Sequence, residues 1–87
     1  MNIFSAIFNI FKSKENIFYN LEASKIMINE NNFNKKKLTL GNTFKVNENI
    51  KIHSFKEKII KDNLIIVVTN NKGKTIGYIT KNELFKK

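Results

Sequence analysis

The chain contains no cysteine, proline, tryptophan or arginine, and it has a single histidine. Without cysteine it can form no disulfide and offers no thiolate for zinc binding or nucleophilic catalysis. His53 is the sole imidazole, and a metal site would need further ligands that the chain does not supply. No paired carboxylates stand at a spacing that suggests general acid and base catalysis. The sequence therefore indicates a protein that is not an enzyme and needs no cofactor or metal ion.

The absence of proline and the presence of only three glycines leave no linker that would divide the chain. Its 87 residues also fall below the ~100 to 200 residues typical of one domain. We therefore expect one structural domain. Within it, residues 1–23 form a helical N-terminal segment and residues 24–87 form a β-rich unit.

The basic residues number 16, all of them lysine, against 7 Asp and Glu, which gives a net charge of +9. The abundant Asn, Ile and Lys resemble the residue usage of an AT-rich genome. Glutamate codons tolerate the same drift, so this bias does not account for the scarcity of acidic residues. A surplus of positive charge favours an anionic partner such as nucleic acid, an anionic membrane or an acidic protein face. Lysine lacks the planar fork with which arginine reads guanine, so nucleic-acid binding is expected to show little sequence preference.

The first eleven residues carry apolar side chains at helical spacing and predict an amphipathic helix. A second helical stretch is predicted from Lys14 to Ala23. The favoured role of the first helix is packing on the β-rich unit, and the alternatives are contact with a partner, with a second copy in a homodimer, or with a membrane. The absence of lysine before Lys12 disfavours the membrane. The residues that would make such contacts are Ile3, Phe4, Ile7, Phe8 and Phe11.

Neither a signal peptide with a basic start nor a run of ~20 apolar residues is found. We therefore expect the protein to stay in the cytoplasm, which would be the host cytoplasm if a phage encodes it.

The run from Leu64 to Val68 is apolar and β-branched and predicts a buried strand. Asn70 to Gly73 is a hairpin turn signal, after which Lys74 to Ile79 should return as the antiparallel partner. Gly77 indicates a bulge or a close backbone approach. Period-two alternation predicts further short strands around Ile26 and Ile28, Leu38 and Leu40, Phe44 and Val46, and Ile50 and Ile52. Lys56 to Asp62 is predicted to be a charged connection, and Thr80 to Leu84 a turn or single helical turn.

These elements predict an α+β fold, with the N-terminal amphipathic helix packed on a small, SH3-like, partly open antiparallel β-barrel. Phe44 is expected in the core because it alternates with Val46. Tyr78 is expected to be more open, since Ile76 and Ile79 can fill the interior.

The last third of the chain has Asp62-Asn63 before the apolar strand, Gly73 in the turn, and Ile76-Gly77-Tyr78-Ile79 at the end. This series resembles the end of a HIRAN domain. The resemblance implies a small β-barrel with SH3-like features that binds DNA, including single-stranded ends. That family commonly has an aromatic residue before the aspartate, where this chain has Ile60-Lys61. The Gly77 to Ile79 ending is also similar to the last strand of bacterial SH3-like domains, which bind cell-wall or peptide ligands outside the cytoplasm.

Three functions follow as hypotheses. The first is a small basic protein that contacts nucleic acid or a nucleoprotein through surface lysines. The second is an inhibitor or adaptor, as made by phages and mobile elements, that binds a host protein complex such as a defence nuclease. The third is a peripheral membrane or structural component. The candidate nucleic-acid contacts are Lys35, Lys36, Lys37, Lys45, Lys51, Lys72, Lys74, Tyr78 and Lys81.

Overall fold

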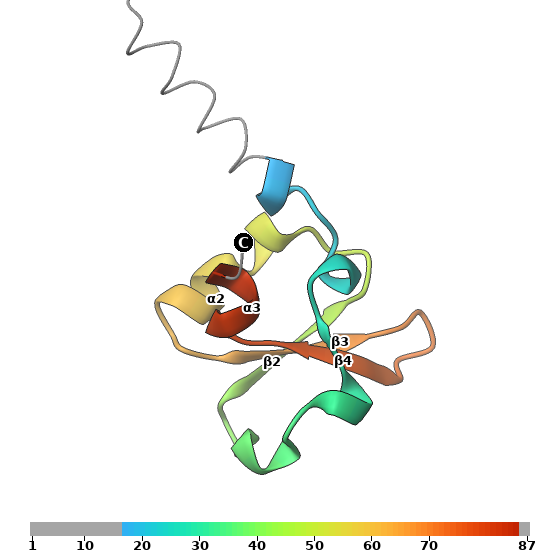
Figure 1. Ribbon diagram of the computed structural model, residues 1–87, viewed down its shortest axis with the longest axis vertical. Helices are drawn as coiled ribbons and strands as arrows, with labels where there is room; N and C mark the ends of the chain where they lie inside the picture. Colours follow the sequence, from blue (N-terminus) through green and yellow to red (C-terminus); the bar gives the residue numbers. More distant parts are fainter. Residues whose placement is uncertain (1–16, 86–87) are drawn as a thin grey trace, which may run out of the picture.

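The structure is a computed structural model that describes residues 17–85. A four-stranded sheet lies between two layers, with short helices on one face and an irregular segment on the other (Figure 1). The strands are β1 (Ile28–Asn29), β2 (Thr43–Asn47), β3 (Ile65–Thr69) and β4 (Thr75–Ile79). The α-helices are α2 (Lys56–Ile60) and α3 (Lys81–Phe85), and the 3₁₀ turns are η1 (Ala23–Lys25), η2 (Glu30–Asn32), η3 (Lys35–Lys37) and η4 (Ile52–Ser54).

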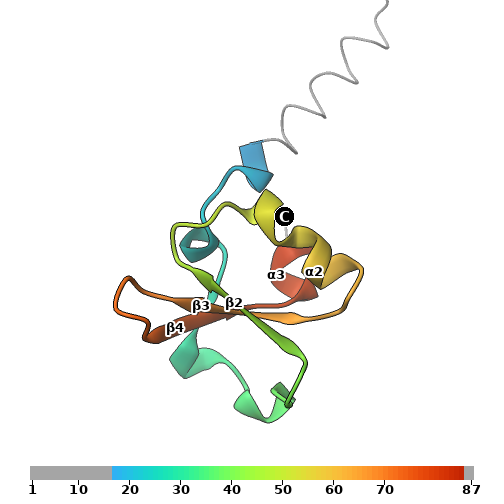
Figure 2. The ribbon, with the colours of Figure 1, turned by 180° about the vertical axis from the view of Figure 1, so that it is seen from behind.

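The strand order in the sheet is β1-β4-β3-β2. β1 pairs with β4 and β4 pairs with β3 in antiparallel fashion, whereas β2 runs parallel to β3. The sheet is therefore mixed and open, with β1 and β2 at its two edges. Figure 2, taken from behind, shows β2 in front of β3 and β4.

The helical face of the sheet holds the larger of two apolar clusters. Ile66, Val68 and Ile79 point from β3 and β4 toward this face and are completely buried. They are covered by the buried side chains of Ala23, Ile52, Phe55, Ile59 and Leu84. Apolar burial of this kind stabilises by roughly 25 cal/mol per Å², so this cluster is the main source of stability among the described residues.

The opposite face carries the second cluster, which the segment from Glu30 to Asn42 covers. Phe33 stacks on Tyr78 with ring centroids 4.4 Å apart and planes inclined by 19°. Val67 lies beside them, and Ile28, Leu38 and Ile65 pack around the group. Aromatic stacking adds about 0.5 to 1.5 kcal/mol beyond the buried area. The polar segment around Phe33 is thus held to the sheet by one aromatic anchor.

The crossover from β2 to β3 explains why these strands are parallel. A parallel pair requires a connection of about a dozen residues or more, usually with a helix. Here the connection contains η4 and α2, and it buries Ile52, Phe55 and Ile59 against the sheet. These three residues stand three and four positions apart, which is a helical spacing.

The prediction of a partly open antiparallel barrel was wrong, because the sheet does not close and its β2–β3 pair is parallel. Ile50 and Ile52 do not alternate in a strand, since Ile52 begins η4. Lys56 to Asp62, predicted as a charged connection, contains α2. Leu38 and Leu40 lie outside the strands. The helix predicted for Met1 to Phe11 lies outside the described residues, while the second helix covers residues 17–19 and ends at a turn before Ala23.

The predicted hairpin is confirmed by the antiparallel pairing of β3 with β4. The Asn70 side chain accepts hydrogen bonds from the backbone N–H groups of Lys72 at 2.9 Å and Lys74 at 3.0 Å. Gly73 has a φ of 82°, which glycine adopts without steric cost. The turn therefore forms where the Asn and Gly residues supply its geometry.

Gly77 allows β1 to approach β4 closely. A Cβ atom at this position would meet the Met27 Sδ atom and would lie 2.7 Å from the Ile28 carbonyl oxygen. Because a real Cβ atom does not come this close to backbone, any larger residue would push β1 away from the sheet.

Replacing the completely buried Ile66 with Ala is expected to lower the free energy of unfolding by about 2 to 5 kcal/mol, because the cluster would be left with a cavity. Leu40→Ala is the matched control, since Leu40 is fully exposed and surface changes usually stay within about 0.5 kcal/mol. Denaturant titration of both variants measures the difference. Equal effects would contradict the assignment of β3 to the core.

Replacing Gly77 with Ala is expected to destabilise the protein by about 1 to 3 kcal/mol through overpacking. The change should appear first as faster hydrogen exchange of the amides in and next to β1, measured by NMR. A variant with unchanged stability and exchange would show that β1 does not lie against Gly77.

Candidate functional site

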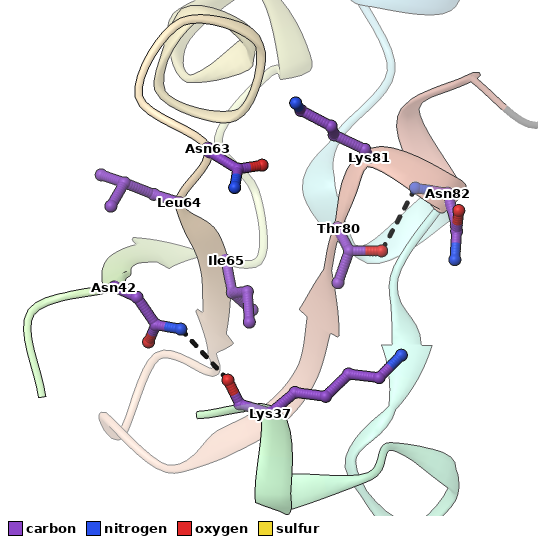
Figure 3. Close-up of a pocket in the computed structure, with 8 residues that line it drawn as sticks. All are labelled: Lys37, Asn42, Asn63, Leu64, Ile65, Thr80, Lys81 and Asn82. Atoms are coloured by element: carbon purple, nitrogen blue, oxygen red, sulfur yellow. Dashed lines mark hydrogen bonds between the residues drawn. The ribbon is translucent and has the colours of Figure 1, made fainter. Parts of the chain in front are cut away.

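A pocket of about 270 Å³ lies where β3 begins and β4 ends. Figure 3 shows the Lys81 side chain extending toward Asn63, and the Lys37 side chain crossing the opposite side of the pocket. None of the residues that line it is acidic. They are Lys37, Asn42, Asn63, Leu64, Ile65, Thr80, Lys81 and Asn82.

The backbone of Lys37 is held in place by Asn42. The Asn42 carboxamide accepts a hydrogen bond from the Thr39 N–H at 2.9 Å and donates one to the Lys37 carbonyl oxygen at 3.1 Å. The Asn42 carbonyl oxygen in turn accepts from the Ile65 N–H at 2.8 Å. The loop that presents Lys37 is thus fixed to the first residue of β3.

Lys81 is positioned by the first turn of α3. The Glu83 carboxylate accepts hydrogen bonds from the Thr80 N–H at 2.7 Å and from the Thr80 hydroxyl at 2.6 Å. This is a capping box, in which a threonine and a glutamate three residues later satisfy the free groups of a helix start. Glu83 therefore occupies the two donors of Thr80, and the side chains in the lining that carry positive charge are those of Lys37 and Lys81.

Asn63 adds a carboxamide from the other side of the pocket. It has a φ of 56°, a left-handed conformation that Asn tolerates better than most residues. It follows α2 and turns the chain into β3. The carboxamides of Asn63 and Asn82 make no hydrogen bonds to the other pocket residues (Figure 3), so their N–H groups are available to a ligand.

The lining includes two lysines and two asparagines and no acidic residue, a composition that suits an anion. None of the three ion pairs among residues 17–85 involves Lys37 or Lys81. Its volume of about 270 Å³ is at the lower limit of the range of about 300 to 1,000 Å³ that is typical of small-molecule pockets. Phosphate is one anion that lysine ammonium groups bind in proteins.

The structure distributes the lysines predicted to bind nucleic acid over several surfaces. It brings Lys37 and Lys81 together at the pocket. Lys72 and Lys74 lie in the hairpin turn at the other end of β4. The five residues of β4 span roughly 16 Å at about 3.3 Å per residue. The other lysines on that list do not line the pocket. Lys35 and Lys36 precede Lys37 in η3, and Lys35 pairs with Glu30 at 3.1 Å. Lys45 is in β2, and Lys51 forms a β-bridge with Glu22.

The expectations for the two aromatic residues were wrong. Tyr78 is only 6% exposed because Phe33 covers it, so its ring face is not open to a stacked base. Phe44 is 39% exposed because β2 is an edge strand, and the Lys58 ammonium lies 5.4 Å from its ring centroid. Neither ring forms part of the pocket.

Other kinds of site are not indicated in the described part of the chain. Within residues 17–85, no group of three His, Asp or Glu side chains is arranged to hold a metal ion, and His53 is exposed. No helix in the same range is both long and apolar enough to cross a membrane. The candidate contacts of the first helix, from Ile3 to Phe11, lie outside the described residues.

Comparison with protein-family models, with curated proteins and with solved structures gives no match for this chain.

Asn63→Ala is expected to destabilise the protein by about 1 to 2 kcal/mol, because Ala resists the left-handed conformation, whereas Asn63→Gly should keep the stability. Both variants remove the carboxamide from the pocket. Because both variants lack the carboxamide, a difference between their thermal unfolding temperatures reports the backbone conformation at residue 63 alone. If the two variants unfold alike, the positive φ does not constrain this position.

Proposed function

We propose that the protein is a non-catalytic binding protein that contacts the phosphate backbone of nucleic acid, with little sequence preference, and that Lys37 and Lys81 anchor one phosphate. The observation that carries this proposal is the pocket itself, which combines two ammonium groups with the carboxamides of Asn63 and Asn82 and has no acidic side chain. Phosphate contacts fix position on a nucleic acid without reading its sequence.

The net charge of +9 supports the same function. Each phosphate that a lysine neutralises releases condensed counterions, which supplies most of the affinity in sequence-independent binding. Lys36 is exposed next to Lys37 in η3 and can extend the contact beyond the pocket. Since Phe33 covers Tyr78, the proposal does not depend on a base stacked against Tyr78.

The second candidate function is an adaptor or inhibitor that binds a protein. One structural observation favours it, namely the exposed edge of β2, a strand that carries the partly exposed Phe44. This candidate predicts that oligonucleotides bind negligibly at physiological salt and that a protein partner is retained after nuclease treatment of a lysate.

The double variant Lys37→Ala, Lys81→Ala tests the leading proposal. It should weaken binding to single- and double-stranded oligonucleotides of any sequence. It should also reduce the slope of log affinity against log salt by about 0.7 to 0.9, since the contact with one phosphate would be lost. Fluorescence anisotropy over a salt series measures both quantities.

The matched control is Lys72→Ala, Lys74→Ala, which removes the same charge from the hairpin turn at the other end of β4. It should change the affinity and the slope much less than the pocket variant. Equal effects of the two double variants would mean that binding is diffuse and does not use the pocket. Absence of binding by the unmodified protein at low salt would refute the proposed function.

A further inference from the structure

The outer edge of β2 has backbone groups that the sheet leaves unpaired. In a parallel pair, alternate residues of a strand direct both their N–H and C=O groups toward the neighbour. The Ile65 N–H donates to the Asn42 carbonyl oxygen and the Glu48 N–H donates to the Thr69 carbonyl oxygen, both at 2.8 Å. This register turns the backbone groups of Phe44 and Val46 toward β3. Those of Thr43 and Lys45 therefore point outward from the sheet.

Nothing among the described residues covers this edge. β2 is the last strand in the sheet order and has five residues in extended conformation. Figure 2 looks onto β2 with no other element drawn in front of it. The opposite edge is different, because β1 has two residues and runs directly into η2. An open edge of this kind is a template for an added strand.

The side chains on β2 indicate which kind of strand could be added. Lys45 pairs with Val67 in the register and so lies on the face that carries the Phe33 cluster. Phe44 lies on the helical face, where the Lys58 ammonium is 5.4 Å from its ring centroid. Lys58 has only a weak ion pair, 4.0 Å from Asp62 with both side chains about half exposed. Positive charge therefore borders the strand on both faces of the sheet.

Three partners could be considered for this edge: a second copy of the chain, an acidic segment of another protein, and a nucleic acid. Charge and backbone chemistry distinguish them. A second copy paired antiparallel through the centre of β2 would place Lys45 opposite Lys45, and like charges directly across a strand pair are destabilising. Each copy would also carry +9. A strand with Asp or Glu opposite Lys45 gains from the same geometry. A nucleic acid has no strand backbone with which to pair Thr43 and Lys45.

We propose that the outer edge of β2 binds an extended acidic segment of a partner protein as a fifth strand of the sheet. The main-chain groups of Thr43 and Lys45 form the new ladder, and Lys45 selects acidic side chains on its own face of the sheet. Neither Lys37 nor Lys81 takes part, so this binding does not depend on the pocket.

The test uses the full chain and a ten-residue peptide in which Glu alternates with Val. In NMR titrations the amides of Thr43 and Lys45 should shift on peptide binding and become protected from hydrogen exchange. Two further peptides carry N-methyl groups, one on the Glu residues and the other on the Val residues. Because an added strand uses only one of its edges, one methylated peptide should lose binding and the other should keep it.

Reversal of charge at Lys45 gives an independent measurement. Lys45→Glu should weaken binding of the Glu peptide by about three- to thirtyfold and favour a peptide in which Lys replaces Glu. Lys25→Glu makes the same change of net charge at an exposed position in η1 and should alter the affinity less than about twofold.

Four results would overturn the proposal. Equal binding of both methylated peptides, or equal effects of the two charge reversals, would mean that the peptide is attracted without forming a strand. Concentration-dependent protection of Thr43 and Lys45 in the absence of peptide would assign the edge to a second copy. Protection by an oligonucleotide but not by the peptide would assign it to nucleic acid. If the pocket variants do not change oligonucleotide binding, the proposed function fails but the proposal for the β2 edge stands, because it does not involve Lys37 or Lys81.

Discussion

The structure depends on β3 being apolar on both of its faces. Ile66 and Val68 require cover on one side, and Ile65 and Val67 require it on the other. The helical crossover supplies the first cover and the segment around Phe33 supplies the second. Helices on one side alone would leave the other face of β3 exposed to water. The irregular segment around Phe33 therefore has to cover that second face. The loops that present Lys37 and Lys81 are therefore anchored by the same packing that protects the sheet.

The sequence predicts the β3–β4 hairpin correctly because its signals are local. A β-branched run, an Asn and Gly turn and a second run lie within a few residues of one another, and the turn residues specify the geometry. The parallel placement of β2 depends on a distant pairing. It follows from the burial of Ile52, Phe55 and Ile59, whose spacing of three and four positions is visible in the sequence but competes with the alternation of Ile50 and Ile52. The strand interpretation of that alternation led to the incorrect barrel.

Part of the candidate site could also be predicted. Excess lysine indicates an anionic partner, and both Lys37 and Lys81 were among the residues selected. Their proximity was not predictable, because it requires the Asn42 anchor and the end of β4 to meet at the start of β3. Asn63 was missed as a pocket residue, although an Asn after a short helix and before a strand is a recognised signal for a left-handed turn. The burial of Tyr78 depends on Phe33, which is 45 positions away in the sequence.

The stack of Phe33 on Tyr78 gives the protein an internal optical reporter. The chain contains no tryptophan and only two tyrosines, so excitation at the tyrosine absorption band, which its phenylalanines do not share, gives emission from these two rings. Tyr19 is partly exposed beside Lys56, whereas Tyr78 is enclosed between the sheet and Phe33. Detachment of the segment around Phe33 would admit water to one of these two rings and leave the other in place. Tyrosine fluorescence can thus report, without an added label, whether the segment around Phe33 is attached to the sheet.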